Sequence, residues 1–298
     1  MSLKLLKNMK LFSGSSNKSL AEEIASDLHL LISPSETVRF ADGEVRVRIS
    51  DDVKDQHVIL VQSLSQPGDS NLMELCQFAQ VLKKEKAGKI TAIIPYLSYA
   101  RQHKAHRAGE AVSVALVASF LKTSGISECV LLDIHEQDAL NYFKMPVLHL
   151  SASDIFAEYI DSHRDDFGED NLVIVAPDKG RKLEAENLAS DLEAGFAVID
   201  KLRHLDKTDE IDHNVLTGEV KNKEAVIFDD MISTGATAIS AAEKCKENGA
   251  FHAYLLATHG VFSKTDNSHW ENSAVDRVFV SNSIQIPAEK RYNKLENV

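Results

Sequence analysis

The sequence predicts an α/β fold of two domains, and three observations support this prediction. Short apolar runs such as NLVIVAP (171–177) and AYLLATH (253–259) alternate with amphipathic segments along the chain. Continuous apolar runs are typical of strands in a parallel sheet that helices cover on both faces. A length of 298 residues suits two domains of about 150 residues each. The hydrophobic share of 44% is large enough to fill two cores.

The predicted elements follow in chain order. A helix is expected to begin at Ser19, because Ser19 and Glu22 have the spacing of a capping box and Leu20, Ile24 and Leu28 then share one face. Buried strands are expected further along, in KITAIIPYL (89–97), ECVLLDI (128–134), NLVIVAP (171–177), EAVIFDD (224–230) and AYLLATH (253–259).

Two segments share one layout of strand, Ser/Gly turn, helix, glycine and second strand. They are residues 57–97 and 225–260, and the first has Gln62 and Ser63 where the second has Asp229 and Asp230. This repeat predicts two similar domains, 1–152 and 153–298, of which the second holds the ligand loop. Two α/β halves also look alike when they merely share a common pattern, so duplication is one of two interpretations.

Charge and composition exclude several classes of protein. A net charge of -12 argues against a nucleic-acid-binding protein, because phosphates would be repelled from most of the surface. No apolar run approaches the roughly 20 residues of a membrane span. The amino-terminal MSLKLLKNMKLF lacks the apolar core and cleavage site of a signal peptide. We therefore expect a cytoplasmic protein without a membrane partner.

Three cysteines, Cys76, Cys129 and Cys245, are widely spaced and include no CxxC pair. This spacing is typical of buried, small apolar residues in a reducing compartment, not of a metal site or a disulfide framework.

An acid pair and a small-residue loop form the most informative motif. Asp229 and Asp230 follow an apolar run, and a polar loop then leads into a predicted helix. Ligands of parallel α/β sheets bind beyond the carboxyl ends of the strands. There the loop and the positive end of the helix would bind a phosphate, while the carboxylates would bind a vicinal diol. The alternative is a capped helix beside two solvated acids. The loop consists of Ser233, Thr234, Gly235, Ala236 and Thr237.

The segment DDMISTGAT (229–237) resembles the phosphoribosyl-binding loop of the type I phosphoribosyltransferase superfamily. From LFSGSSN (11–17) to VFVSNSIQIP (278–287), the chain as a whole resembles the ribose-phosphate diphosphokinases. The resemblance implies two phosphoribosyltransferase-type domains, each a mostly parallel sheet flanked by helices. It also implies the function: pyrophosphate transfer from Mg-ATP to the C1 hydroxyl of ribose 5-phosphate, which gives 5-phosphoribosyl 1-pyrophosphate and AMP for nucleotide biosynthesis. Further landmarks are RFADGE, IIPYLSYARQ, LLDIH, APDKG, IDKLR and ATHGVFS.

The resemblance implies that ATP is bound by two segments. Phe40, Asp42 and Glu44 would reach a neighbouring subunit's adenine, which predicts a homo-oligomer, and Arg101 and Gln102 would contact the nucleotide. The latter pair lies in SYARQHKAHRAGE (98–110), a locally basic stretch that suits a triphosphate and that could instead be a solvated loop. The family commonly has Asp at the position of His103.

The resemblance further implies a magnesium cofactor and two catalytic cations. His135 and Asp178 would hold Mg²⁺, and Lys201 and Arg203 would neutralise the reacting phosphates. Arg181 stands where the family commonly has Gly.

Two alternatives share part of these motifs. A phosphoribosyltransferase would share the loop but consume the product, and the second α/β half and YARQ argue against it. A non-catalytic regulatory homologue would keep the fold and lose the catalytic cations, which the chain retains at Lys201 and Arg203.

Overall fold

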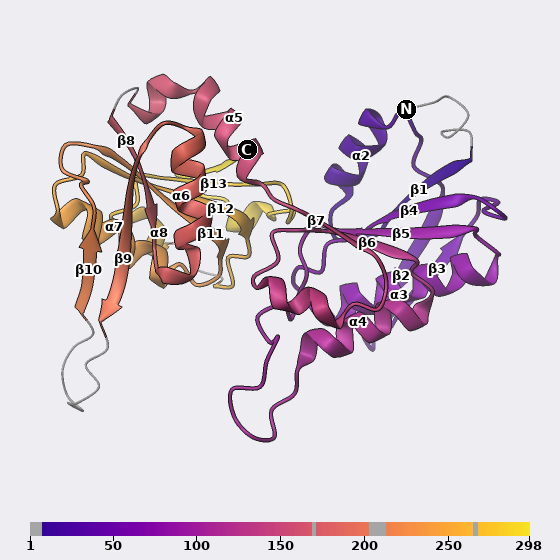
Figure 1. The fold of residues 1–298 in the computed structure, drawn as a ribbon. Helices are drawn as coiled ribbons and strands as arrows, with labels where there is room; N and C mark the ends of the chain where they lie inside the picture. The colour runs from indigo at the N-terminus through magenta and orange to yellow at the C-terminus, as the bar shows by residue number, and fades with distance from the viewer. Residues whose placement is uncertain (1–7, 169–170, 203–212, 265–267) are drawn as a thin grey trace. The chain divides into compact units, whose positions relative to one another are not determined.

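The computed structural model describes residues 8–168, 171–202, 213–264 and 268–298 and confirms the predicted α/β class (Figure 1). The chain divides into two compact units. Unit 1 consists of Met1–Leu150 with Ser283–Gln285, and unit 2 of Ser151–Asn282 with Ile286–Val298. Residues Ser283–Gln285 belong to unit 1 although they lie near the end of the chain. The Ser63 hydroxyl helps to hold them there, because it donates a hydrogen bond to the Ser283 carbonyl at 2.8 Å. The predicted domains 1–152 and 153–298 stay a prediction.

The main sheet of unit 1 is entirely parallel. Its helices are α2 (Lys18–Asp27), α3 (Gly68–Lys84) and α4 (Ser113–Ser124), with the 3-10 helix η1 (Gln137–Tyr142). Its strands in spatial order are β1 (Met9–Ser13), β4 (His57–Val61), β5 (Lys89–Ile94), β6 (Glu128–Leu132) and β7 (Val147–Leu150).

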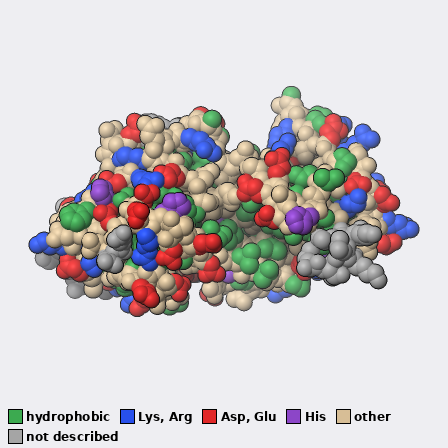
Figure 2. Space-filling view, turned by 90° about the horizontal axis from the view of Figure 1, so that it is seen from above, with side chains coloured by type: hydrophobic (Ala, Val, Ile, Leu, Met, Phe, Trp, Pro, Cys, Tyr) green, Lys and Arg blue, Asp and Glu red, His purple; other side chains and the backbone are tan. Residues whose placement is uncertain are grey.

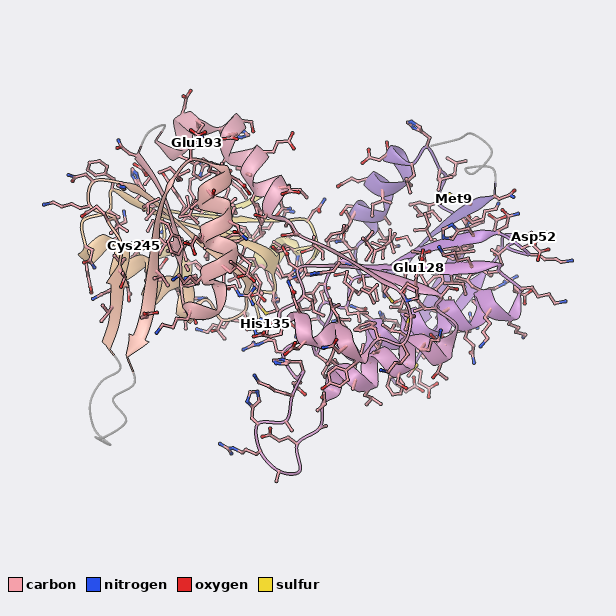
Figure 3. All side chains as sticks on the ribbon, in the orientation of Figure 1. Met9, Asp52, Glu128, His135, Glu193 and Cys245 are labelled. Atoms are coloured by element: carbon pink, nitrogen blue, oxygen red, sulfur yellow. The ribbon has the colours of Figure 1, made fainter. Side chains whose placement is uncertain are left out.

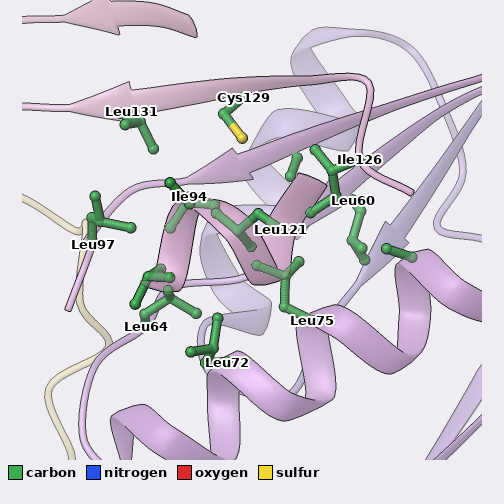
Figure 4. Packing of buried hydrophobic residues seen from close by; sticks show 14 of the residues in the cluster. Leu60, Leu64, Leu72, Leu75, Ile94, Leu97, Leu121, Ile126, Cys129 and Leu131 are labelled. Atoms are coloured by element: carbon green, nitrogen blue, oxygen red, sulfur yellow. The ribbon is translucent and has the colours of Figure 1, made fainter. Parts of the chain in front are cut away.

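Alternate residues of the unit 1 strands are buried on opposite faces. Leu60 of β4 packs in one cluster with Leu75 of α3 and Leu121 of α4 (Figure 4). Ile59 packs instead with Ala21 of α2. Both faces of the sheet are therefore covered, as the continuous apolar runs predict.

The predicted start of the first helix is wrong by a short distance. Helix α2 begins at Lys18, and Asn17 is its cap, because the Asn17 side chain accepts a hydrogen bond from the Leu20 amide at 3.3 Å. Asn is as good a cap as Ser, so the Ser19–Glu22 spacing was a misleading signal.

A two-stranded antiparallel hairpin, β2 (Ser35–Arg39) and β3 (Val45–Ile49), lies beside α3. Arg39 of β2 connects the hairpin to α3, because its guanidinium donates a hydrogen bond to the fully buried Glu74 at 3.0 Å. Glu74 also accepts from the Ser15 amide at 2.8 Å and from the Thr37 hydroxyl at 3.2 Å. A buried carboxylate needs such partners, so this cluster fixes the hairpin and its turn.

The sheet of unit 2 is parallel except for one edge strand, β10. Its strands in spatial order are β10 (His213–Thr217), β9 (Gly195–Leu202), β8 (Leu172–Ala176), β11 (Glu224–Ile232), β12 (His252–Gly260), β13 (Arg277–Val280) and β14 (Leu295–Asn297). Its α-helices are α5 (Ser153–Ser162), α6 (Lys182–Asp191), α7 (Ala236–Glu247) and α8 (Ser268–Glu271), and its 3-10 helices are η2 (Arg164–Phe167), η4 (Lys179–Arg181) and η5 (Ala288–Lys290).

The central strand β11 is likewise covered on both sides. Ile227 packs in one cluster with Ala241 and Ala242 of α7. The ring of Phe228 lies edge-on to Phe156 of α5, with centroids 6.0 Å apart. A strand buried on both faces has one place for polar chemistry, which is its end.

Surface and cysteine properties agree with the sequence. Acidic side chains are scattered among basic ones on the face seen in Figure 2. Burial raises the pKa of Cys129 and Cys245 to about 12, so neither is a reactive thiolate. No helix in the described part of the chain is long and apolar enough to cross a membrane.

Candidate functional site

Carboxylates from three neighbouring strands of unit 2 lie at one edge of its sheet. Ile227 of β11 pairs with Val175 of β8, and Ala176 pairs with Val198 of β9. Counting onward from these pairs places Asp230, Asp178 and Asp200 at the same level. Parallel strands present their carboxyl ends at a common edge, where α/β proteins bind ligands.

The acid pair lies inside the last part of β11, not after it. The strand continues through Asp229 and Asp230 to Ile232, which corrects the expectation that the strand ends at the pair. Asp230 is 6% exposed, and its amide donates to Asp229 Oδ1 at 2.9 Å. Burial raises the pKa of the Asp229 carboxyl far above its usual range, and the Asp230 charge raises it further. A buried like-charged pair is costly unless a ligand or cation compensates it.

Arg181 places a positive charge beside this pair. Its Nε lies 3.9 Å from Asp230 Oδ1, and its charge opposes the rise of the Asp229 pKa. The guanidinium also lies 3.6 Å from Glu184. In the sequence, Arg181 stands out only as a departure from the family pattern, because nothing in the spacing shows that η4 would bring it to β11.

The loop after β11 has the geometry of an anion site. Gly235 adopts a φ of 81°, a left-handed conformation that favours glycine, and precedes the twelve-residue helix α7. The first amides of a helix have no partner within the helix, and its dipole favours an anion there. Thr234 is exposed, and the Ser233 hydroxyl lies 3.3 Å from that of Ser263. Ser233 to Thr237 therefore form one continuous polar turn at the helix start.

An aromatic cluster lies directly behind this loop. The buried Trp270 stacks on Tyr292 with centroids 5.8 Å apart, and Phe262 lies edge-on to it at 6.0 Å. Any Cβ at position 235 would lie 2.3 Å from the Trp270 ring. Trp270 could not be predicted from the sequence, because no local pattern connects it with a loop that precedes it by more than thirty residues.

Asp178 caps the turn η4 at the end of β8. Its Oδ1 accepts from the amides of Gly180 and Arg181 at 2.8 and 3.3 Å. The neighbouring Asp200 forms an ion pair with Lys179 at 3.3 Å through Oδ2, and its buried Oδ1 has no hydrogen-bond partner. Carboxylate oxygens of this kind are the donors that Mg²⁺ prefers.

Within the described ranges, no three His, Cys, Asp or Glu side chains are grouped to hold a metal ion by themselves. This fits Mg²⁺ that enters with a nucleotide, since such an ion keeps several waters and takes only one or two protein carboxylates. The residues present are thus compatible with the predicted cofactor.

The structure describes the backbone of only one of the two predicted catalytic cations, Lys201 and Arg203. Lys201 lies near the end of β9, where it pairs with Asn214 of β10. Arg203 lies outside the described residues.

In unit 1, the turn of the β2–β3 hairpin carries three of the predicted nucleotide contacts. The Phe40 amide donates to the Glu44 carbonyl at 2.8 Å, and Asp42 accepts from the Glu44 amide at 3.1 Å. Phe40 is 44% exposed, with the Arg46 guanidinium 5.6 Å from its ring centroid. An exposed ring beside two carboxylates suits a stacking base with hydrogen-bond donors.

The remaining unit 1 candidates lie in loops at the carboxyl ends of β5 and β6. Arg101 and Gln102 are exposed in the β5–α4 connection, which extends away from its sheet (Figure 1). His103 is buried, and its Nδ1 has no hydrogen-bond partner. His135 follows β6 and is partly buried (Figure 3). All of these positions thus lie on the ligand-facing ends of parallel strands.

The structure therefore brings together Asp178, Asp229, Asp230 and the loop 233–237 in unit 2. It places the hairpin turn, the β5–α4 connection and His135 in unit 1. A parallel sheet that presents an acid pair and a glycine loop at the carboxyl ends of its strands is typical of an α/β protein that binds its ligand at that edge.

Comparison with known proteins identifies the family. Residues 9–125 match the model of the N-terminal domain of ribose phosphate pyrophosphokinase, and residues 213–298 match that of the phosphoribosyl synthetase-associated domain. The chain belongs to the ribose-phosphate pyrophosphokinase family.

Individual relatives support this assignment over almost the whole chain. Ribose-phosphate pyrophosphokinase 1 of Streptococcus pyogenes is 36% identical over 98% of this chain and 90% of its own length. The ribose-phosphate pyrophosphokinase of Caldanaerobacter subterraneus is 37% identical over 97% and 90%. A crystal structure of phosphoribosylpyrophosphate synthetase from Mycobacterium smegmatis matches with a TM-score of 0.89, at 34% identity, covering 98% of this chain and 94% of that one.

Proposed function

We propose that the chain transfers the β,γ-pyrophosphoryl group of Mg-ATP to the C1 hydroxyl of ribose 5-phosphate. The products are AMP and 5-phosphoribosyl 1-pyrophosphate. The observation that supports this proposal most is the buried acid pair of β11 followed by the Gly235 loop at the start of α7. This arrangement offers acceptors for two ribose hydroxyls and donors for one phosphate on the same chain segment.

The sugar phosphate is bound by unit 2 in this proposal. The carboxylates of Asp229 and Asp230 accept hydrogen bonds from the ribose hydroxyls, directly or through a metal ion. The amides and hydroxyls of residues 233–237 bind the 5-phosphate. Binding at both ends fixes the sugar and its C1 hydroxyl, and such positioning supplies much of the rate of phosphoryl-type transfer.

The nucleotide is bound by unit 1 residues. Arg101 and Gln102 contact ATP, while Phe40, Asp42 and Glu44 come from a neighbouring subunit, so the active form is a homo-oligomer. His135 and Asp178 hold Mg²⁺, which supplies charge neutralisation of the phosphates when bound. Lys201 and Arg203 stabilise the negative charge on the transferred group.

One assay tests the proposal. The purified protein is incubated with Mg-ATP and ribose 5-phosphate, and the nucleotide products are separated by chromatography. We expect AMP in equal amount to 5-phosphoribosyl 1-pyrophosphate and no product when either substrate is omitted. ADP with free phosphate, or no turnover, would refute the proposal.

A further inference from the structure

The basic residue at the acid pair has no role in the function proposed above. Arg181 lies at the end of η4, directly before α6, and its side chain is 13% exposed. Glu184, one turn further along, lies 3.6 Å from the guanidinium on the helix side. The other side of the guanidinium faces Asp230 at 3.9 Å, a distance at which charges attract but no direct hydrogen bond forms.

Two features of the turn keep Arg181 in this place. Asp178 accepts a hydrogen bond from the Arg181 amide at 3.3 Å, which fixes the backbone. The turn η4 also contacts β11, the strand that carries Asp230. The guanidinium therefore belongs to the edge where the sugar would bind, not to the outer surface of the helix.

The electrostatics of this edge require a cation. Asp229 and Asp230 are adjacent, Asp230 is buried and Asp229 partly buried, and ribose 5-phosphate itself is an anion. Even when Asp229 is protonated, bringing an anion to the buried Asp230 carboxylate is unfavourable unless positive charge is already there. Either a divalent ion or a fixed side chain can provide it.

We propose that Arg181 is a fixed counter-ion of the acid pair, which allows ribose 5-phosphate to bind without a divalent metal ion. Arg181 is a positioning residue here: it acts on the carboxylates that contact the sugar. The inference rests on the proposed function, because it assumes that the acid pair binds the sugar. It adds that magnesium is required for the nucleotide and not for the sugar phosphate.

The test is calorimetric titration of the full-length protein with ribose 5-phosphate, once in EDTA and once in Mg²⁺. The wild-type dissociation constant should be the same within about threefold in the two buffers. Arg181→Gln should bind roughly tenfold more weakly in EDTA, which corresponds to about 1.4 kcal/mol. Mg²⁺ should recover most of this loss, because the ion replaces the missing charge. Thermal unfolding of each variant verifies that it is folded.

Two further variants separate charge from structure. Arg181→Lys keeps the charge and should bind nearly as well as wild type in EDTA. Lys182→Gln removes an equal charge from the adjacent, exposed position and should leave both dissociation constants unchanged. A merely structural role for Arg181 predicts instead that Arg181→Gln loses affinity equally in EDTA and Mg²⁺, and that result would overturn the inference.

Failure of this inference differs from failure of the proposed function. Wild-type binding that is seen in Mg²⁺ and vanishes in EDTA refutes the counter-ion role while the proposed function stands. If Arg181→Gln binds ribose 5-phosphate in EDTA as tightly as the wild-type protein does, the counter-ion role is likewise refuted and the proposed function stands. Absence of ribose 5-phosphate binding in both buffers overturns this inference, and the product assay described above then decides the proposed function separately.

Discussion

Trp270 lies against Gly235, so closely that a Cβ added at Gly235 would stand 2.3 Å from the indole ring. The ring is held in turn by Tyr292 and Phe262. Two features thus fix the position of the proposed phosphate loop. The buried aromatic cluster packs against it, and Gly235 adopts the left-handed backbone conformation that the turn requires.

Gly235→Ala should therefore raise the KM for ribose 5-phosphate on the order of 10²-fold, since displacing a binding loop by about 1 Å can have an effect of this size. The KM for ATP should change little, because the residues proposed to contact ATP lie in unit 1. Steady-state kinetics with each substrate varied in turn provides the measurement.

Gly249→Ala is the matched control. Gly249 follows α7 and has a φ of 87°, close to the 81° of Gly235, but its Cβ would meet only the Lys221 side chain, at 3.3 Å. This variant should lose stability through the same backbone strain and keep its KM values. Equal kinetic effects of both variants would show that strain, and not the collision with Trp270, is responsible.

Trp270 is the only tryptophan in the sequence, so its fluorescence reports on the loop. Titration with ribose 5-phosphate should change the emission of the wild-type protein, because a bound dianion alters the field at the indole. The change should saturate at the dissociation constant found by calorimetry. ATP alone should leave the signal unchanged, and a response to ATP but not to the sugar phosphate would speak against the placement of the ligand.

The acid pair predicts a dependence of stability on pH. The folded state raises the pKa of Asp229, so the folded protein binds this proton more tightly than the unfolded chain. Protonated Asp229 therefore contributes to the stability of the fold. This contribution is present below the pKa of the residue in the unfolded chain, about 3.9, and is lost as pH rises through its pKa in the folded protein. Stability from this group should therefore decline between about pH 4 and about pH 8.

Thermal unfolding of wild type and Asp229→Asn across this range measures the effect. The variant cannot ionise at position 229 and should show a flatter profile, with the largest gain over wild type at the high end. Parallel profiles for the two proteins would mean that Asp229 ionises at an ordinary pKa.

Lys201→Ala and Arg203→Ala should each lower kcat on the order of 10²–10³-fold while changing KM far less. The reason is that cations beside the reacting phosphates act mainly on charge that develops in the transition state. Single-turnover kinetics measures the chemical step. Lys207→Ala, farther along the chain, is the control and should behave like wild type; an equal fall in all three variants would point to general charge instead of positioned catalysis.

The fold class and the ligand loop could be predicted because their signals are local. Continuous apolar runs identify parallel strands, and DDMISTGAT places an acid pair, a glycine and a helix start in one short segment. These signals correctly placed β5, β6, β8, β11 and β12.

Other features depend on contacts between distant segments, which spacing does not reveal. Arg181 meets Asp230 because β8 and β11 are adjacent, and Trp270 reaches Gly235 across the aromatic cluster. The predicted start of α2 was wrong for a local reason. Asn17 and Ser19 are both good caps, and the sequence alone does not show which of them the chain places at the helix start after β1.

The central claim is that the acid pair of β11 binds ribose 5-phosphate. The most direct measurement is calorimetric titration of Asp229→Asn combined with Asp230→Asn, using ribose 5-phosphate and ATP as separate ligands. We predict a loss of sugar-phosphate affinity on the order of 10²-fold, the size expected for losing hydrogen bonds to charged groups, with ATP affinity retained. Ribose 5-phosphate affinity equal to that of the wild-type protein would contradict the claim.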